Sequence, residues 1–152
     1  MTIRVRNAGP ADAQIVAEFN TLIARETEGI SLDAARVRSG VEAVLLDATK
    51  GVYFVAEVDG AVAGQLMITS EWSDWRNGNF LWIQSVYVRK EYRNHGVFKT
   101  LYRHVEALAR SRADVCGLRL YVEESNSRAQ QTYEALGMHP AKYRMMEVDF
   151  VL

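Results

Sequence analysis

The chain has 152 residues, about the length of one domain, and 49 % of them are hydrophobic and 24 % charged, which is typical of a globular rather than a disordered protein. Lysine and arginine number 18 and aspartate and glutamate 19, so the net charge of −1 argues against nucleic acid or an anionic membrane as a partner. A single cysteine, Cys116, excludes an internal disulfide, and the three histidines lack metal-ligand spacing.

The N-terminal residues carry charges where a signal peptide needs an apolar run, and no apolar stretch approaches about 18 residues. We therefore expect one cytoplasmic domain over residues 1–152, without a bound metal.

Periodicity and turn residues predict a strand, two helices and a β-hairpin in the first half of the chain. Gly9-Pro10 ends the first strand, Gly29 and Gly51 follow the two helices, and Asp59-Gly60 is a strong hairpin turn. The expected ranges are 2–7 for the strand, about 12–26 and 32–47 for the helices, and 52–58 and 61–69 for the hairpin strands.

The second half predicts three more strands and two helices. The expected ranges are strand 80–88, helix 96–113, strand 118–123, helix 127–136 and strand 146–152. The order β-α-α-β-β-β-α-β-α-β predicts an α/β (α+β) fold with a mixed sheet of six to seven strands and helices on both faces. Residues 80–123 form a crossover unit whose two strands should run parallel.

The loop before the helix at Gly96 has the properties of an anion site. It lies between a strand end and a helix start, where backbone N–H groups lack intrahelical partners and the helix dipole is positive. Gly96 permits a tight turn, and Arg93 and Lys99 add positive charge. From the loop alone, it is equally well explained that Gly96 only allows the chain to turn from strand to helix and binds no anion.

Two motifs give the chain a resemblance to a known family. The sequence Arg93-x-x-Gly96-x-Phe98 matches two of the three defined positions of the signature Gln/Arg-x-x-Gly-x-Gly/Ala. The second motif, Asn-x-x-Ala followed by Tyr-x-x-x-Gly, is present as Asn126, Ala129, Tyr133 and Gly137. The whole chain resembles the GNAT superfamily of acyl-CoA-dependent N-acetyltransferases, and the block 72–102 is most similar to its spermidine/spermine acetyltransferase branch and to uncharacterised bacterial relatives.

The resemblance implies a binding site for acetyl-CoA as co-substrate. In the family, the strand before the glycine loop splays from its neighbour and its backbone groups hold the pantetheine and the thioester carbonyl. The residues implied for cofactor binding are Val86, Tyr87 and Val88 on the strand, Arg93, Asn94, His95, Gly96, Val97, Phe98 and Lys99 in the loop, and Asn126 and Tyr133. Phe98 replaces the usual small residue, and its ring is expected to face the sheet.

The same resemblance makes Tyr133 the donor of a proton to the leaving thiol. A helix-face tyrosine that packs on the sheet is the alternative for Tyr133. Asn126 is implied to bond the cofactor, and it is equally compatible with an N-cap.

No motif secures a general base or an acceptor site. Gln84-Ser85 stands where polyamine acetyltransferases carry an acidic pair, which weakens a polyamine assignment, although Gln84 can hold a water. We expect acceptor contacts at Glu28, Trp75 and Gln84. The carboxylates considered as a base are Glu28, Glu71, Asp74 and Glu123.

The function implied is direct acetyl transfer from acetyl-CoA to a primary amine of a small molecule or of a peptide or protein. The alternative is a non-catalytic acyl-CoA-binding or sensor module on the same fold. Homodimers are common in this family, so the resemblance leaves a homodimer open.

Overall fold

A computed structural model describes all 152 residues, and the chain forms two compact units, Met1–Leu120 and Tyr121–Leu152. The first unit contains a sheet, three α-helices and two short 3-10 turns, and the second contains one helix. The strands are β1 (Ile3–Asn7), β2 (Val52–Val58), β3 (Ala61–Ser73), β4 (Gly78–Val88) and β5 (Val115–Arg119). The helices are α1 (Ala13–Glu28), α2 (Ala34–Leu46), α3 (Val97–Ser111) and α4 (Ser127–Ala135), and the 3-10 turns are η1 (Pro10–Asp12) and η2 (Lys90–Tyr92).

The five strands lie side by side in the order β1-β2-β3-β4-β5. Neighbouring strands are antiparallel except β4 and β5, which pair in parallel as the crossover connection through α3 requires. The parallel pair and the α+β class are confirmed. The expected sheet of six to seven strands is wrong, because the sheet has five.

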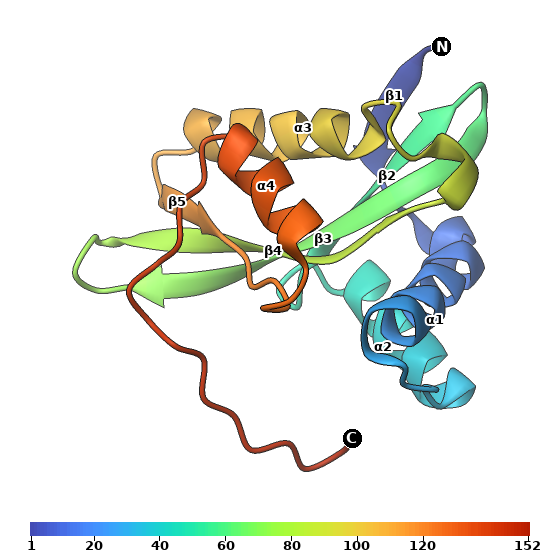
Figure 1. The fold of residues 1–152 in the computed structure, drawn as a ribbon, viewed down its shortest axis with the longest axis horizontal. Helices are drawn as coiled ribbons and strands as arrows, with labels where there is room; N and C mark the ends of the chain where they lie inside the picture. The colour runs from blue at the N-terminus through green and yellow to red at the C-terminus, as the bar shows by residue number, and fades with distance from the viewer. The chain divides into compact units, whose positions relative to one another are not determined.

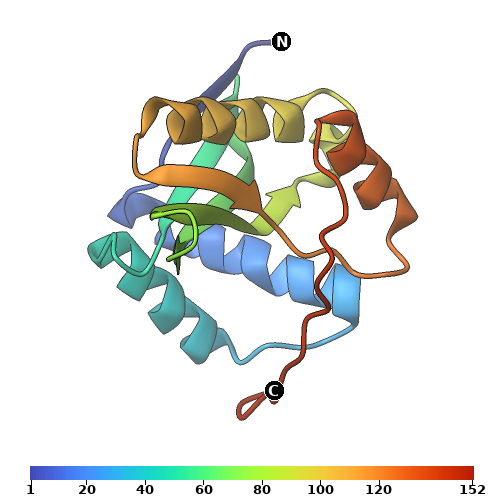
Figure 2. The same cartoon turned by 90° about the vertical axis from the view of Figure 1, so that its left-hand side faces the viewer.

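Helices cover both faces of this sheet, as predicted. Figures 1 and 2 show α1 and α2 against one face and α3 against the other. Because side chains alternate along a strand, Tyr53 and Val55 of β2 pack with Val16 of α1 and Val41 of α2. Phe54, between them, points to the other face and lies 4.9 Å from the ring of His104 on α3.

The chemistry of the helix ends agrees with the sequence. Gly29, in the left-handed conformation, ends α1, and the Asp33 side chain caps α2 by accepting a hydrogen bond of 2.8 Å from the Arg36 N–H. The α3 helix has the inward stripe that its periodicity predicts: Val97, Leu101 and Val105 are all at most 1 % exposed.

The hairpin of β3 and β4 is longer than the sequence indicated. The expected strands cover 61–69 and 80–88, but β3 continues through Ser73 and β4 begins at Gly78. Only residues 74–77 turn, with Asn77 at a φ of 49°. Cross-strand hydrogen bonding thus extends the ladder into polar residues that the hydrophobic pattern does not mark as strand.

The fifth strand lies earlier than expected. It covers Val115–Arg119 instead of residues 118–123, because its only partner, β4, pairs with it along Asn79–Trp82 alone. A strand exists only where a neighbour accepts and donates its backbone hydrogen bonds.

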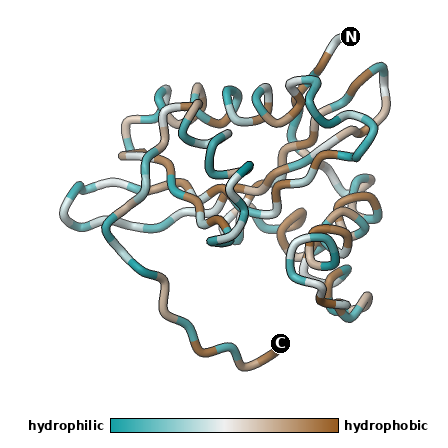
Figure 3. The backbone as a smooth tube through the Cα atoms, viewed as in Figure 1, coloured by the Kyte–Doolittle hydropathy of each residue, from teal (hydrophilic) through white to brown (hydrophobic).

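The expected final strand at 146–152 is also wrong. In the second unit, α4 is followed by a segment without helix or strand. Its hydrophobic and hydrophilic residues alternate along the chain (Figure 3), yet Met146, Val148 and Phe150 are 86 %, 76 % and 93 % exposed. Alternation makes one face apolar, but it does not supply the neighbouring strand that a β-strand needs.

Gly64 marks a close approach between the sheet and the start of α3. A Cβ at this position would lie 2.8 Å from the carbonyl oxygen of Tyr87 and 3.1 Å from Cγ1 of Val97. We expect Gly64→Ala to lower the free energy of unfolding by about 1–3 kcal/mol, because backbone must move to admit the methyl group. Thermal unfolding should show a midpoint lower by roughly 3–10 °C.

Gly40→Ala is the matched control. Gly40 lies inside α2, and a Cβ there meets no atom within 4 Å, so this change should stabilise the protein by about 0.5–1 kcal/mol. A Gly64→Ala protein as stable as the wild type would contradict the close approach.

Candidate active site

The C-terminal half of β4 has an edge that no strand covers. The parallel ladder with β5 ends at the pair Trp82–Arg119, whereas β4 continues to Val88. Along 83–88, β4 therefore has no paired strand on this side. Backbone N–H and C=O groups on this edge must find partners other than β5, such as a bound molecule.

A bulge interrupts β4 on its other side as well. The antiparallel register with β3 passes from Gln65–Tyr87 to Met67–Gln84, so Ser85 and Val86 stand opposite the single residue Leu66. Ser85 has a φ of 51°, which is unusual for a residue with a side chain. The backbone of Val86 consequently has no paired strand residue on either side.

The chain then turns directly into the predicted anion loop. After β4 come η2 and a turn at residues 93–96, in which Asn94 and Gly96 have φ values of 66° and 82°. The turn ends at the N-terminus of α3, where the first N–H groups have no acceptor within the helix and the dipole is positive. The unpaired strand edge and the positive end of the α3 dipole therefore follow one another within about ten residues.

The predicted loop residues differ in what they expose. Arg93, Asn94, His95 and Lys99 have exposed positions. Val97 is only 1 % exposed, so its side chain belongs to the core and only its backbone can address a ligand. Phe98, expected against the sheet, is half-buried with its ring centroid 6.2 Å from that of Tyr102.

Arg93 ties the loop to β4 and to α1. Its Nε donates to the carbonyl oxygen of Val88 at 2.8 Å, and its terminal nitrogen lies 2.8 Å from a carboxylate oxygen of Glu26. The guanidinium also lies over the Tyr87 ring, 5.5 Å from the centroid. One arginine thus orders the strand end and carries the positive charge that an anion would meet.

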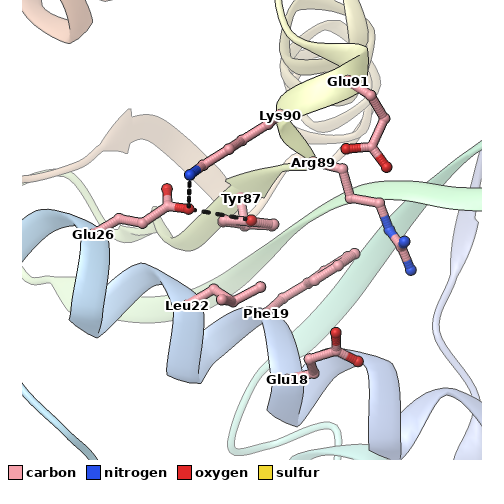
Figure 4. Close-up of a pocket in the computed structure, with 8 residues that line it drawn as sticks. All are labelled: Glu18, Phe19, Leu22, Glu26, Tyr87, Arg89, Lys90 and Glu91. Atoms are coloured by element: carbon pink, nitrogen blue, oxygen red, sulfur yellow. Dashed lines mark hydrogen bonds and ion pairs between the residues drawn. The ribbon is translucent and has the colours of Figure 1, made fainter.

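Glu26 lines a pocket of about 280 Å³ between α1 and the end of β4. Figure 4 shows its carboxylate directed toward Lys90 and the Tyr87 hydroxyl, at 3.9 Å and 3.5 Å. Burial, followed by the charge of Glu26, raises the pKa of the Tyr87 phenol, which therefore stays neutral at physiological pH. The pocket is lined by Glu18, Phe19, Leu22, Glu26, Tyr87, Arg89, Lys90 and Glu91.

Of the three expected acceptor contacts, the structure brings one to the bulge. Gln84 directly precedes the bulge, and its Nε2 donates to Oγ1 of Thr69 at 2.6 Å. Glu28 is exposed at the end of α1, about 200° around the helix from Glu26. Trp75 is 83 % exposed in the β3–β4 turn, which the length of β4 separates from Val86 by roughly 25 Å.

The other carboxylates considered as a base lie in ordinary surroundings. Glu71 pairs with Arg119 at 2.7 Å, and Asp74 accepts a hydrogen bond from the Trp75 N–H in the exposed turn. Glu123, in the second unit, accepts a hydrogen bond from the Ser125 N–H.

The second unit contains the two remaining motif residues. The Asn126 side chain caps α4 by accepting a hydrogen bond of 3.1 Å from the Ala129 N–H, so the N-cap interpretation is confirmed. Tyr133 lies on the same helix and is half-buried. Burial raises the pKa of its phenol, so the hydroxyl keeps its proton at neutral pH.

Sequence reasoning missed two residues of this region. Glu26 follows Phe19 and Leu22 at helical spacing, and this shared stripe was the available signal. Gln65 is a polar residue in the middle of an apolar strand pattern, and it is fully buried in the structure. An isolated amide in such a run is the signal that could have marked it.

The chain contains no group of three or more histidine, cysteine, aspartate or glutamate residues that could hold a metal ion. None of its helices combines the length and apolar character needed to cross a bilayer.

Comparison with known proteins gives a family match and many structural matches. Residues 18–138 match the model of the acetyltransferase (GNAT) family. A possible acetyltransferase from Clostridium difficile 630 is 46 % identical, with a TM-score of 0.91 and coverage of 100 % of both chains. No curated protein matches the sequence.

More distant structures share the fold. A predicted acetyltransferase of Clostridium acetobutylicum, solved with acetyl-CoA, is 14 % identical with a TM-score of 0.78, and the match covers 99 % of this chain and 97 % of that one. A ribosomal-protein-alanine N-acetyltransferase from Brucella melitensis biovar Abortus 2308 is 17 % identical with a TM-score of 0.77, over 98 % and 100 % of the two chains.

The pair of Glu26 and Arg93 predicts a measurable competition with an anionic ligand. We expect Glu26→Gln to tighten the binding of CoA up to about fivefold, because loss of the carboxylate frees the guanidinium and an exposed ion pair contributes about 0.2–1 kcal/mol. Isothermal titration at low and high salt should show the gain shrinking as salt screens the charges.

Glu42→Gln is the control, since it removes an equal charge from an exposed ion pair with Arg38 on α2. This change should leave CoA affinity unaltered. Weaker CoA binding by Glu26→Gln would instead mean that Glu26 holds Arg93 in its binding position.

Proposed function

Since the chain belongs to the acetyltransferase (GNAT) family, we propose that it transfers an acetyl group from acetyl-CoA directly to a primary amine of a small molecule or of a peptide or protein. One observation carries this proposal. The edge of β4 left open by β5 leads, through a left-handed turn at Gly96, to the N-terminus of α3. These features fit a thioester and a pyrophosphate joined by an extended arm.

We assign the thioester end to the strand and the phosphate end to the loop. Backbone groups of Val86, Tyr87 and Val88 are suited to the pantetheine arm and the acetyl carbonyl, because β5 does not pair with this part of β4. In the loop, the charge of Arg93 and Lys99 and the backbone from Asn94 through Phe98 suit the pyrophosphate. His95 is a positional residue of this turn.

The reaction forms an amide bond between the amine nitrogen and the acetyl carbon while the carbon–sulfur bond breaks. The nitrogen loses a proton and the sulfur gains one. A backbone N–H at the bulge would donate to the carbonyl oxygen as negative charge develops there. In our assignment, Tyr133 gives its proton to sulfur and recovers a proton from solvent; because burial raises its pKa, the phenol carries this proton before the transfer.

The amine must arrive neutral. At pH 7 only about one alkylamine in two thousand is uncharged, given a pKa of about 10.4. We propose that a water held by Gln84 accepts the proton, because this side chain lies beside the bulge and cannot itself take one.

The expected acceptor contacts do not favour a polyamine. The acidic pair of the spermidine/spermine branch is absent at Gln84-Ser85, and Glu28 offers a single exposed carboxylate. Asn126 is assigned to the cofactor through its amide NH₂ group, since its oxygen caps α4.

The experiment that tests this function measures free-thiol release from acetyl-CoA over a panel of small amines, amino-terminal peptides and lysine peptides. Turnover with at least one amine class supports the proposal. Binding of acetyl-CoA without turnover of any acceptor would favour the sensor alternative, and no binding of any CoA species would refute both.

Tyr133→Phe should lower kcat about 100-fold or more while acetyl-CoA affinity changes little, because the ring remains and only the proton donor is lost. The steady-state rate and the dissociation constant are measured on the same preparation. Because burial raises the pKa of Tyr133, the wild-type kcat should fall on the alkaline side only above about pH 10.

Tyr143→Phe is the control, since Tyr143 belongs to the same unit and is 73 % exposed. Its kcat should equal that of the wild type. An unchanged kcat in Tyr133→Phe would remove Tyr133 from the acid role.

A further inference from the structure

Gln65 is a fully buried polar side chain in the middle of the sheet. It lies on β3 with 0 % exposure, between Gly64 and the fully buried Leu66, on the face covered by α1. Its Nε2 donates to the carbonyl oxygen of Ser85 and to Oδ1 of Asn20, each at 3.0 Å. One amide group therefore links β3, α1 and the bulge of β4.

The residue that Gln65 holds is the one with the unusual backbone. Ser85 has a φ of 51° and stands at the point where the register with β3 breaks. A non-glycine residue in this conformation is held there by its surroundings rather than by its own preference. The bond from Gln65 to the Ser85 carbonyl fixes the peptide that joins Ser85 to Val86, and so the direction of the Val86 N–H.

Two more groups extend this link into the core. Asn20 donates through Nδ2 to the Tyr53 hydroxyl at 3.0 Å. Burial raises the pKa of Tyr53, while its hydrogen bonds with Asn20 and Ser85 act in the opposite direction. The phenol stays neutral, and the bulge is thus held from α1, β2 and β3.

Stability alone does not explain a glutamine at this position. Oε1 of Gln65 is buried and has no hydrogen-bond partner, which costs free energy. An apolar side chain of the same shape would remove that cost and pack beside the cross-strand neighbours Val55 and Tyr87, but it would leave the Ser85 carbonyl and Asn20 Oδ1 without this donor. The amide is therefore best explained by what it does to the bulge.

We propose that Gln65 is a positioning residue that aims the Val86 N–H at the carbonyl oxygen of the acetyl thioester. The effect on catalysis rests on the proposed function. The claim that Gln65 fixes the bulge rests only on its hydrogen bond to the Ser85 carbonyl. Gln65 itself does not touch the reacting atoms, because it acts through the Ser85–Val86 peptide.

The decisive variant is Gln65→Met, which keeps the shape and removes the donor. In the unliganded protein, we expect the backbone amide resonance of Val86 to shift, because the Ser85–Val86 peptide loses the bond that orients it. We further expect kcat to fall about 10- to 100-fold with the dissociation constant of CoA unchanged, and the preference for acetyl-CoA over CoA to be reduced, since only the acetyl carbonyl uses this N–H.

Val58→Ala is the matched control for a general loss of stability. Val58 is 2 % exposed at the far end of β2, so this change should lower the unfolding midpoint without moving the Val86 resonance or kcat. Asn20→Leu is the second variant in case Gln65→Met does not fold. Asn20 is half-buried on α1, and its loss removes one of the two acceptors of Gln65. This variant should shift the Val86 resonance and lower kcat in the same direction, by a smaller amount.

The outcomes separate the two claims. A wild-type protein that binds no CoA species would refute the proposed function, whereas the Val86 resonance would still decide whether Gln65 holds the bulge. A folded Gln65→Met protein with an unmoved Val86 resonance, or with a kcat within twofold of the wild type, overturns the positioning role. A fall in kcat that Val58→Ala reproduces overturns it as well.

Discussion

The site depends on the loss of hydrogen-bonding partners along β4. In a strand inside a sheet, the backbone N–H and C=O groups on both edges normally form hydrogen bonds with the two neighbouring strands. Here β5 leaves after Trp82, and the bulge at Ser85 interrupts the pairing with β3 three residues later. The β4 edge beyond Trp82 and the backbone of Val86 at the bulge are therefore left to partners outside the sheet, such as a ligand. The end of pairing with β5 alone would expose a whole strand edge. The bulge adds one position on that edge, Val86, which is unpaired with β3 as well.

The C-terminal part of β4, which lacks strand partners, needs other contacts to fix its conformation, and α1 provides them at two places. Near its middle, Asn20 joins Gln65 and Tyr53 below the bulge. Near its end, Glu26 pairs with Arg93, which in turn bonds the last carbonyl of β4. The first contact is buried and fixes geometry, while the second is partly exposed and contributes mainly charge. One helix thereby connects the proposed chemical end of the site with its proposed phosphate end.

The electrostatic design agrees with the nearly neutral composition. Positive charge is needed only where a pyrophosphate would meet the loop, and a helix terminus with Arg93 and Lys99 can supply it. In the structure the Arg93 guanidinium pairs with Glu26, so part of this positive charge is balanced locally. A local field of this kind can bind an anion without any general affinity for polyanions.

The sequence by itself determined the helices, the hairpin at Asp59-Gly60, the parallel crossover and the glycine turn before α3, because periodicity, caps and turn residues act over a few neighbours. The tertiary structure decided where β5 ends, why 146–152 is not a strand, and which polar side chains matter. Glu26 and Arg93 are 67 positions apart, and Gln65 and Asn20 are 45. Such pairs leave no trace in local pattern, since a hydrogen bond between distant segments exists only once the sheet and α1 have packed together.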